Sequence, residues 1–150
     1  MNLGELINAR GIARLETREK SEALDELIDL LAKRKEITSK DRLKRAIKDR
    51  ERILSTGIGS GIAVPHAKIG QVKKFCAVVG ISKPGIPFDS LDGKPVHVVF
   101  MIAAPEDQHE EYLRILRVIT QNLKDEEVRK RIVAAKDDKA VLAIFAELGY

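Results

Sequence analysis

The segment that most restricts the fold is Val96–Ile102, which consists of apolar residues except for His97. Both alternating faces of a strand built from it would be hydrophobic, which is typical of a central strand covered on two sides. Phe75–Ile81 has the same character and is predicted to be a second buried strand, with Cys76 as a small core residue. We therefore expect a sheet with helical layers on both faces.

Helical patterns flank these two strands. An apolar stripe begins at Ser21, and Thr38 with Asp41 resembles a capping box for a second helix. Pro105 suits the first turn of another helix. Further expected elements are a short strand over 11–16, a turn-rich segment over 83–95, a helix from Asp125 and a last helix over 137–148. The predicted fold class is α/β (α+β): one three-layer α/β/α domain over 1–150, with a small mixed sheet.

Composition favours a soluble globular protein, because 44% of the residues are hydrophobic and 33% are charged. No apolar run approaches the roughly 20 residues of a membrane helix, and no signal peptide is visible. A single cysteine excludes an intrachain disulfide, so a cytoplasmic location is predicted.

The segment Ser55–His66 reads Ser-Thr-Gly-Ile-Gly-Ser-Gly-Ile-Ala-Val-Pro-His. Alternating glycines permit positive φ angles and close approach, and successive bare N–H groups can surround an anion. Pro65 stiffens the chain just before His66. These features suit a histidine that meets a phosphoryl group, but spacing alone leaves an ordinary surface histidine beside a turn equally open.

Other catalytic motifs do not fit. The glycines are out of register with the dinucleotide fingerprint, and no Gly-Lys-Ser/Thr sequence ends a nucleotide loop. Ser60 lacks the flanking glycines of a hydrolase elbow, and three separated histidines with one cysteine offer no zinc spacing. No nucleotide, metal or other cofactor is therefore expected.

Positive charge is concentrated in residues 33–52, which hold ten Lys/Arg and four Asp/Glu. One alternative is a nucleic-acid-associated domain that uses this segment; interleaved acids and the lack of aromatic residues argue against it. Arg50 shares a helical face with apolar residues. It needs either an anionic partner or a stem that extends to water, and spacing leaves both open.

Arg50-Glu51 followed by Ser55–His66 closely resembles the phosphorylation-site signature of enzyme IIA domains of the bacterial phosphotransferase system. The match is to the fructose/mannitol and nitrogen-regulatory group, so a mannitol-type IIA fold is implied. Gly85–Val96 and Phe100–Pro105 resemble the same family. The likeness extends from about residue 5 to the C-terminus.

The resemblance implies a phosphotransferase component with a phosphohistidine intermediate. His66 would accept phosphate from the phosphocarrier protein HPr and pass it to a cysteine of enzyme IIB, with Arg50 near the phosphate. Phosphoryl transfer relies on positioning and charge stabilisation. We expect backbone amides of the glycine loop to contribute to that stabilisation, from Gly57, Ile58, Gly59, Ser60 and Gly61.

One position departs from the family pattern. Family members commonly carry a second active-site histidine on the helix after the Ala-Ala-Pro segment, and the matching residue here is Tyr112. His109, one helical turn earlier, is the alternative for that role. The other interpretation of His109 is an exposed residue in the first turn of the helix. Lys68 is predicted to be solvated, and His97 to be a structural histidine with a satisfied hydrogen bond.

Two roles within the family remain. A single domain without fused transport modules favours a regulatory protein of the nitrogen type, whose phosphorylation state selects its targets. The alternative is a sugar-uptake component that passes phosphate to enzyme IIB and meets the membrane only through a permease. Expected partners are thus an HPr-type phosphocarrier and either enzyme IIB or regulatory targets, without nucleic acid.

Overall fold

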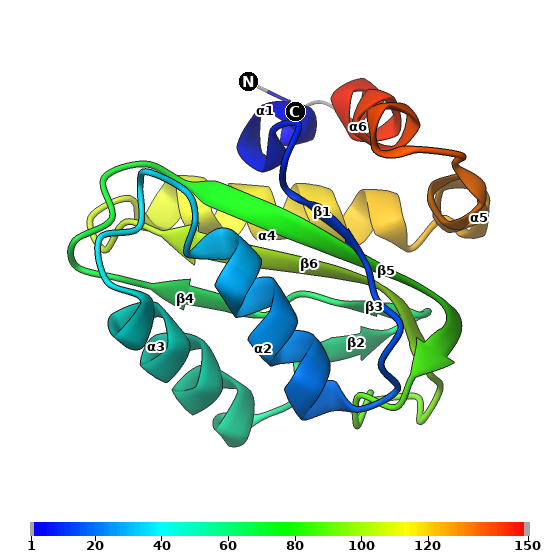
Figure 1. The fold of residues 1–150 in the computed structure, drawn as a ribbon, viewed down its shortest axis with the longest axis horizontal. Helices are drawn as coiled ribbons and strands as arrows, with labels where there is room; N and C mark the ends of the chain where they lie inside the picture. The colour runs from blue at the N-terminus through cyan, green and yellow to red at the C-terminus, as the bar shows by residue number, and fades with distance from the viewer. Residues whose placement is uncertain (1, 149–150) are drawn as a thin grey trace.

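The two apolar segments form the centre of a six-stranded mixed sheet (Figure 1). The computed structural model describes residues 2–148. Strand β5 (Cys76–Ile86) pairs antiparallel with β6 (Val96–Ala104), with Val79 opposite Phe100. The strand order is β1-β5-β6-β3-β2, and β4 also pairs with β6. The remaining strands are β1 (Ile12–Arg14), β2 (Gly57–Gly59), β3 (Ile62–Ala63) and β4 (His66–Lys68).

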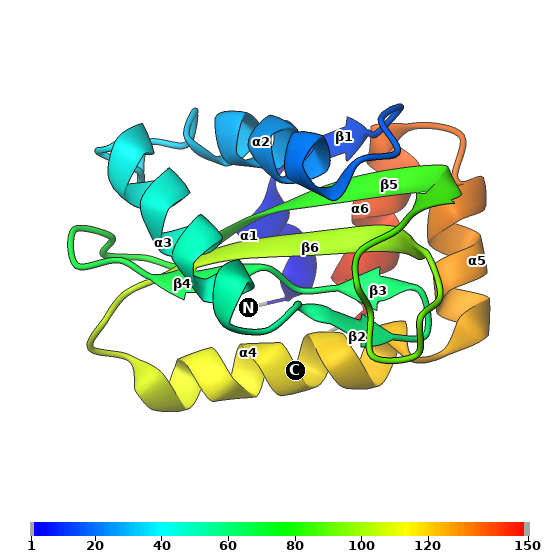
Figure 2. The same ribbon diagram turned by 90° about the horizontal axis from the view of Figure 1, so that it is seen from below.

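Helices cover both faces of the sheet, which confirms the predicted three-layer α/β/α class. Figure 2 shows α2 (Lys20–Leu31) on one side of the sheet and α4 (His109–Leu123) on the other. The α2 side also carries α3 (Lys40–Ile53). The α4 side also carries α1 (Leu3–Ile7), α5 (Glu126–Ala134) and α6 (Asp138–Glu147).

Strand β6 is buried on both faces, as its sequence predicts. Phe100 and Ile102 belong to the core on the α4 side, whereas Val99 and Met101 belong to the core under α2 and α3. Cys76 is also fully buried, and burial raises the pKa of its thiol to about 12. The thiol is therefore a core side chain without nucleophilic character at neutral pH.

Several element boundaries differ from those predicted. Ser39, not Thr38, accepts the capping hydrogen bond of α3. Helix α4 begins at His109 rather than at Pro105. Strand β5 continues to Ile86, inside the segment predicted as turns, because Ile86 still pairs with Val96 on β6. Leu54, which follows the last residue of α3, is 58% exposed.

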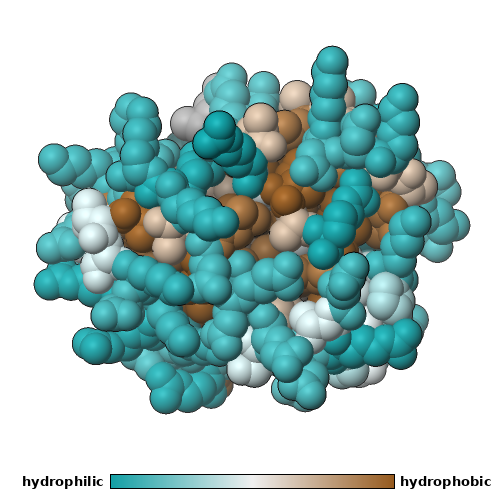
Figure 3. Space-filling view, viewed as in Figure 1, coloured by the Kyte–Doolittle hydropathy of each residue, from teal (hydrophilic) through white to brown (hydrophobic). Residues whose placement is uncertain are grey.

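The basic segment lies largely on α3, where its lysines pair with acids of α2. Lys48 and Lys44 lie 2.9 and 3.9 Å from Asp25, and Lys40 lies 2.6 Å from Asp29. These pairs join the two helices across their exposed sides. The outer face is accordingly hydrophilic, with apolar atoms visible between charged side chains (Figure 3). Within residues 2–148, no helix has the length and apolar content needed to cross a membrane.

Candidate functional site

His66 is the first residue of β4. Val64 and Pro65 separate it from β3, and both strands pair with β6. Strand β3 pairs with Val98 and Val99, and β4 resumes parallel pairing with His66 opposite Ile102. Between the two strands, the carbonyl of Val64 lies 2.6 Å from His66 Nδ1. A carbonyl oxygen accepts hydrogen bonds and cannot donate them, so Nδ1 carries the proton. In the neutral ring, Nε2 is therefore the nitrogen with a free lone pair.

The surroundings of His66 favour this neutral ring. Burial is the largest cause that lowers its pKa below the ordinary value of 6.5, and the charge of Arg50 lowers it further. The Val64 carbonyl and the charge of Glu51 act in the opposite direction without reversing the shift. The imidazole thus stays nucleophilic to a lower pH than a solvated histidine would.

Arg50 lies in the last turn of α3, the helix that packs against β4. Its Nη1 donates a hydrogen bond to the carbonyl of Leu54 at 2.8 Å, which fixes the guanidinium beyond the helix end. Its positive charge lowers the pKa of His66, and it opposes the burial that raises the pKa of Tyr112. Arg50 therefore acts electrostatically on both rings.

Glu51 is the important residue of this region that sequence reasoning did not single out. It is 8% exposed and accepts hydrogen bonds from the backbone N–H of Thr56 at 2.7 Å and from its hydroxyl at 2.6 Å. Lys20 on α2 completes the cluster, with its Nζ 2.9 Å from Oε2 of Glu51. Glu51 lies one turn after Ile47 on the buried stripe of α3, and this spacing was the signal in the sequence that could have identified it as buried. This cluster joins α2 and α3 to the segment that leads to His66.

Replacing Glu51 with alanine should destabilise the protein by about 3 kcal/mol, because Lys20 and the Thr56 amide lose a buried partner. Chemical denaturation measures this change. Asp49→Ala is the matched control, since Asp49 is an exposed acid on the same helix that pairs with Arg52. Its effect should stay within about 0.5 kcal/mol. Equal effects of the two variants would contradict the structural role of Glu51.

Tyr112, rather than His109, contacts His66. The ring centroids of Tyr112 and His66 are 5.6 Å apart, and Tyr112 is 9% exposed. His109 is exposed and lies behind Tyr112, with centroids 6.3 Å apart. Lys68 was predicted to be solvated, but it has partners within the protein. Its Nζ lies 2.6 Å from His109 Nδ1 and 5.0 Å from the Tyr112 ring centroid. Tyr112 thus stands between His66 and a pair of basic side chains.

The glycine segment forms a tight hairpin rather than an open loop. Ser60 and Gly61 form its turn with φ angles of 57° and 78°, the positive values that two-residue hairpin turns require. The Ser60 amide donates to the Asp92 carboxylate at 3.0 Å, and the Gly57 amide donates to the Ser55 hydroxyl at 3.1 Å. These two amides therefore already have partners within the protein.

The turn of the hairpin lies near His97, not near His66. A Cβ atom on Gly61 would be 3.5 Å from His97 Cδ2. His97 is the second residue of β6, whereas His66 pairs with Ile102 five residues further along, about 16 Å away at strand spacing. The structure thus brings together His66, Arg50 and Tyr112, and places Ser60 and Gly61 elsewhere. His97 has the hydrogen bond predicted for it, from Nδ1 to the Ser82 carbonyl at 2.9 Å.

A mixed sheet between two helical layers is the fold of phosphotransferase IIA proteins. Residues 5–148 match the family model described as "Phosphoenolpyruvate-dependent sugar phosphotransferase system, EIIA 2", and the chain belongs to this family. It is 39% identical over 145 residues to the "PTS system fructose-specific EIIABC component" of Bacillus subtilis. That match covers 96% of this chain and 23% of the Bacillus protein, so the chain spans about a quarter of that relative.

Relatives of the nitrogen-regulatory branch are also similar. The "Nitrogen regulatory protein" of Bradyrhizobium diazoefficiens is 32% identical over 136 residues, which cover 88% of this chain and 86% of that protein. Among solved structures, IIA-Ntr from Neisseria meningitidis superimposes with a TM-score of 0.88 at 26% identity, covering 95% and 97% of the two chains.

Mannitol-type structures share the fold as well. IIA mannitol from Escherichia coli superimposes with a TM-score of 0.79 at 26% identity, covering 93% of this chain and 98% of that one. A complex of enzyme IIAMtl with phosphorylated enzyme IIBMtl from Escherichia coli matches with the same TM-score at 25% identity, covering 93% and 96% of the two chains. The predicted membership in the family and its mannitol-type fold are both confirmed.

Proposed function

We propose that this chain is a phosphohistidine carrier that accepts a phosphoryl group from an HPr-type phosphocarrier on Nε2 of His66. The observation that carries this proposal is the hydrogen bond from Nδ1 to the Val64 carbonyl. It leaves the neutral ring with its lone pair on Nε2, next to the positive charge of Arg50. A nucleophile of this kind needs no general base.

The transfer exchanges one phosphorus–nitrogen bond for another. The bond from phosphorus to the donor's imidazole breaks, the electron pair returns to that ring, and the lone pair on His66 Nε2 forms the new bond. The transition state is loose, so positioning and charge stabilisation dominate. We assign the charge stabilisation to Arg50, with Lys68 beyond Tyr112 as a second source of positive potential. The Ser60–Gly61 turn is too distant to contribute.

The test is incubation with radiolabelled phosphoenolpyruvate, enzyme I and HPr. The chain should acquire an acid-labile, base-stable label, the signature of a phosphoramidate. A label stable in acid, or no label under conditions that phosphorylate HPr, would overturn the proposal.

For the biological role, we favour a nitrogen-type regulatory protein whose phosphorylation state selects its targets. The TM-score of 0.88 to IIA-Ntr supports this choice. The measurement is capture of partners from cell extract by the phosphorylated and unphosphorylated forms. A regulatory protein should retain at least one partner in one state and lose it in the other.

A second candidate role is a fructose-type transport component, which the 39% identity to the Bacillus subtilis protein supports. In that role, phosphate should pass from His66 to a cysteine of enzyme IIB. The two roles differ in one assay, namely loss of label from the phosphorylated chain when a fructose-type or mannitol-type enzyme IIB is added. Rapid transfer to IIB would favour transport over regulation.

Tyr112 should matter more than His109 for transfer, because Tyr112 is the ring that packs against His66. Tyr112→Ala should slow phosphorylation about tenfold, as expected when an aromatic contact is lost. Tyr112→Phe and His109→Ala should each stay within about threefold of wild type, since the ring contact remains in both. Rates from rapid-quench labelling would measure this. A larger loss in His109→Ala would instead assign the role to His109.

A further inference from the structure

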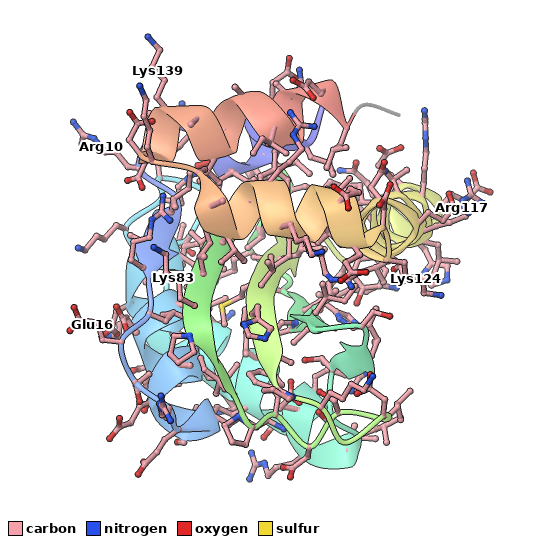
Figure 4. All side chains as sticks on the ribbon, turned by 90° about the vertical axis from the view of Figure 1, so that its right-hand side faces the viewer. Arg10, Glu16, Lys83, Arg117, Lys124 and Lys139 are labelled. Carbon is pink, nitrogen blue, oxygen red and sulfur yellow. The ribbon has the colours of Figure 1, made fainter. Side chains whose placement is uncertain are left out.

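A second candidate site lies at the other end of β6, where α5 crosses the sheet. A cavity of about 580 Å³ opens there, a volume typical of small-molecule sites. Figure 4 shows this side, with α5 across the ends of β5 and β6 and Lys83 beside them. The lining residues come from β5, β6 and α5, and are Lys83, His97, Glu126, Arg129, Lys130, Val133 and Ala134.

His97 presents a ring nitrogen to this region. Its Nδ1 donates to the Ser82 carbonyl at 2.9 Å, so Nε2 of the neutral ring carries the lone pair and can accept a hydrogen bond from a ligand. The two carbons that flank Nε2 face glycines. The Cβ position of Gly61 is 3.5 Å from Cδ2, and that of Gly85 is 3.0 Å from Cε1. Neither glycine has a side chain that would cover this edge of the ring, and His97 as a whole is half-buried.

Arg129 is held next to this ring edge. Its Nη1 donates to the carbonyls of Leu123 and Lys124 at 2.9 and 2.6 Å, which fixes the guanidinium against the end of α4. Its Nε lies 3.8 Å from the same Cβ position on Gly61 that lies near His97. One small anion can therefore reach both side chains. A guanidinium already fixed in place loses little conformational entropy when it binds an oxyanion.

The cavity carries a net positive charge and an apolar wall. Glu126 is the one acidic residue among the described residues of the lining, and it forms an ion pair with Lys130 at 3.3 Å. The positive charges of Lys83 and Arg129 are therefore not neutralised by the lining residues. Val133 and Ala134 on α5 provide apolar surface beside these cations. An oxyanion attached to a small hydrophobic group matches both features.

We propose that this cavity binds a small organic anion, with its oxyanion on Arg129 and Lys83, its apolar part on Val133 and Ala134, and the His97 ring beside it. The site is separate from His66 and does not depend on the proposed phosphoryl transfer. Its oxyanion chemistry suits both phosphate esters and carboxylates, and the probes below distinguish them.

The experiment is an NMR titration of the full chain carrying His66→Ala, which removes the other phosphate-binding candidate. The probes are phenyl phosphate, benzoate and inorganic phosphate at constant ionic strength. Phenyl phosphate or benzoate should cause saturable shifts of the His97 and Arg129 side-chain signals. The tighter of the two identifies the oxyanion, and inorganic phosphate should bind at least tenfold more weakly. Shifts that do not saturate, or that occur away from the cavity, would overturn the proposal.

Two variants then test the geometry. Lys83→Gln should weaken binding about fivefold, the effect of removing one partly solvated charge. Ala134→Trp should abolish binding by filling the cavity from an exposed position on α5. Lys139→Gln is the matched control, because Lys139 is exposed on α6 and does not line the cavity (Figure 4). Unchanged affinity in Ala134→Trp, or an equal loss in Lys139→Gln, would refute the site.

Discussion

Replacing His66 with alanine should abolish phosphorylation by the phosphoenolpyruvate, enzyme I and HPr system. Nε2 of His66 is the nitrogen with a free lone pair in the neutral ring, and it is held next to the charge of Arg50. Without that nitrogen, no bond to phosphorus can form at this position. Fold loss is not expected, because His66 is at the partly exposed start of a short strand. Labelling at saturating HPr, combined with a denaturation curve, measures both effects.

The control for this variant is His97→Ala. Its ring also donates Nδ1–H to a backbone carbonyl, but it lies at the opposite end of β6. It should keep the full label. Persistent label in His66→Ala, or loss of label in His97→Ala alone, would contradict the assignment to His66.

The pH dependence of labelling should reflect the lowered pKa of His66. The neutral ring is the nucleophile, and burial together with Arg50 lowers the pKa below 6.5. The rate should therefore fall on acidification only at a pH below 6.5, with HPr phosphorylation kept non-limiting. An acid limb at or above 6.5 would contradict the buried environment of the ring.

Arg50→Ala should slow phosphoryl transfer about 100-fold, the cost of removing one group that stabilises charge in the transition state. It should also raise the pKa of His66, because the arginine's positive charge lowers it. The lost hydrogen bond to Leu54 should cost only about 1 kcal/mol of stability. Rapid-quench labelling and NMR titration of His66 provide the two readouts.

Arg52→Ala is the matched control for Arg50→Ala. Arg52 is an exposed arginine on the same helix, and it pairs with Asp49 rather than acting on His66. Its transfer rate and its His66 pKa should match those of wild type. A pKa shift without a rate loss in Arg50→Ala would mean that the arginine tunes the ring but does not contact the phosphoryl group.

The sequence predicted the central strands and most helices because their burial patterns are local. Val96–Ile102 is apolar on both faces and became β6, while Asp125 and Asp137 cap the helices expected after them. The hairpin was not predicted. Its two strands pair with each other over a few residues, and β3 also pairs with β6, which is distant in sequence, so the glycines alone resembled a loop.

For the site, the resemblance identified His66, Arg50 and Tyr112 as candidates, and the fold brings them together. It could not decide between Tyr112 and His109, because one helical turn separates them and the orientation of α4 depends on tertiary packing. The Lys20–Glu51 pair was missed for a similar reason, since it joins two residues that are 31 positions apart in the chain.

The partner of the His66 ring has an evolutionary consequence. Many catalytic histidines are oriented by a carboxylate side chain, which a single codon change can delete. Here the orienting group is the carbonyl of Val64, and every amino acid supplies a carbonyl. Substitutions of the Val64 side chain should thus leave this hydrogen bond in place, and the choice of reactive nitrogen follows from the path of the backbone.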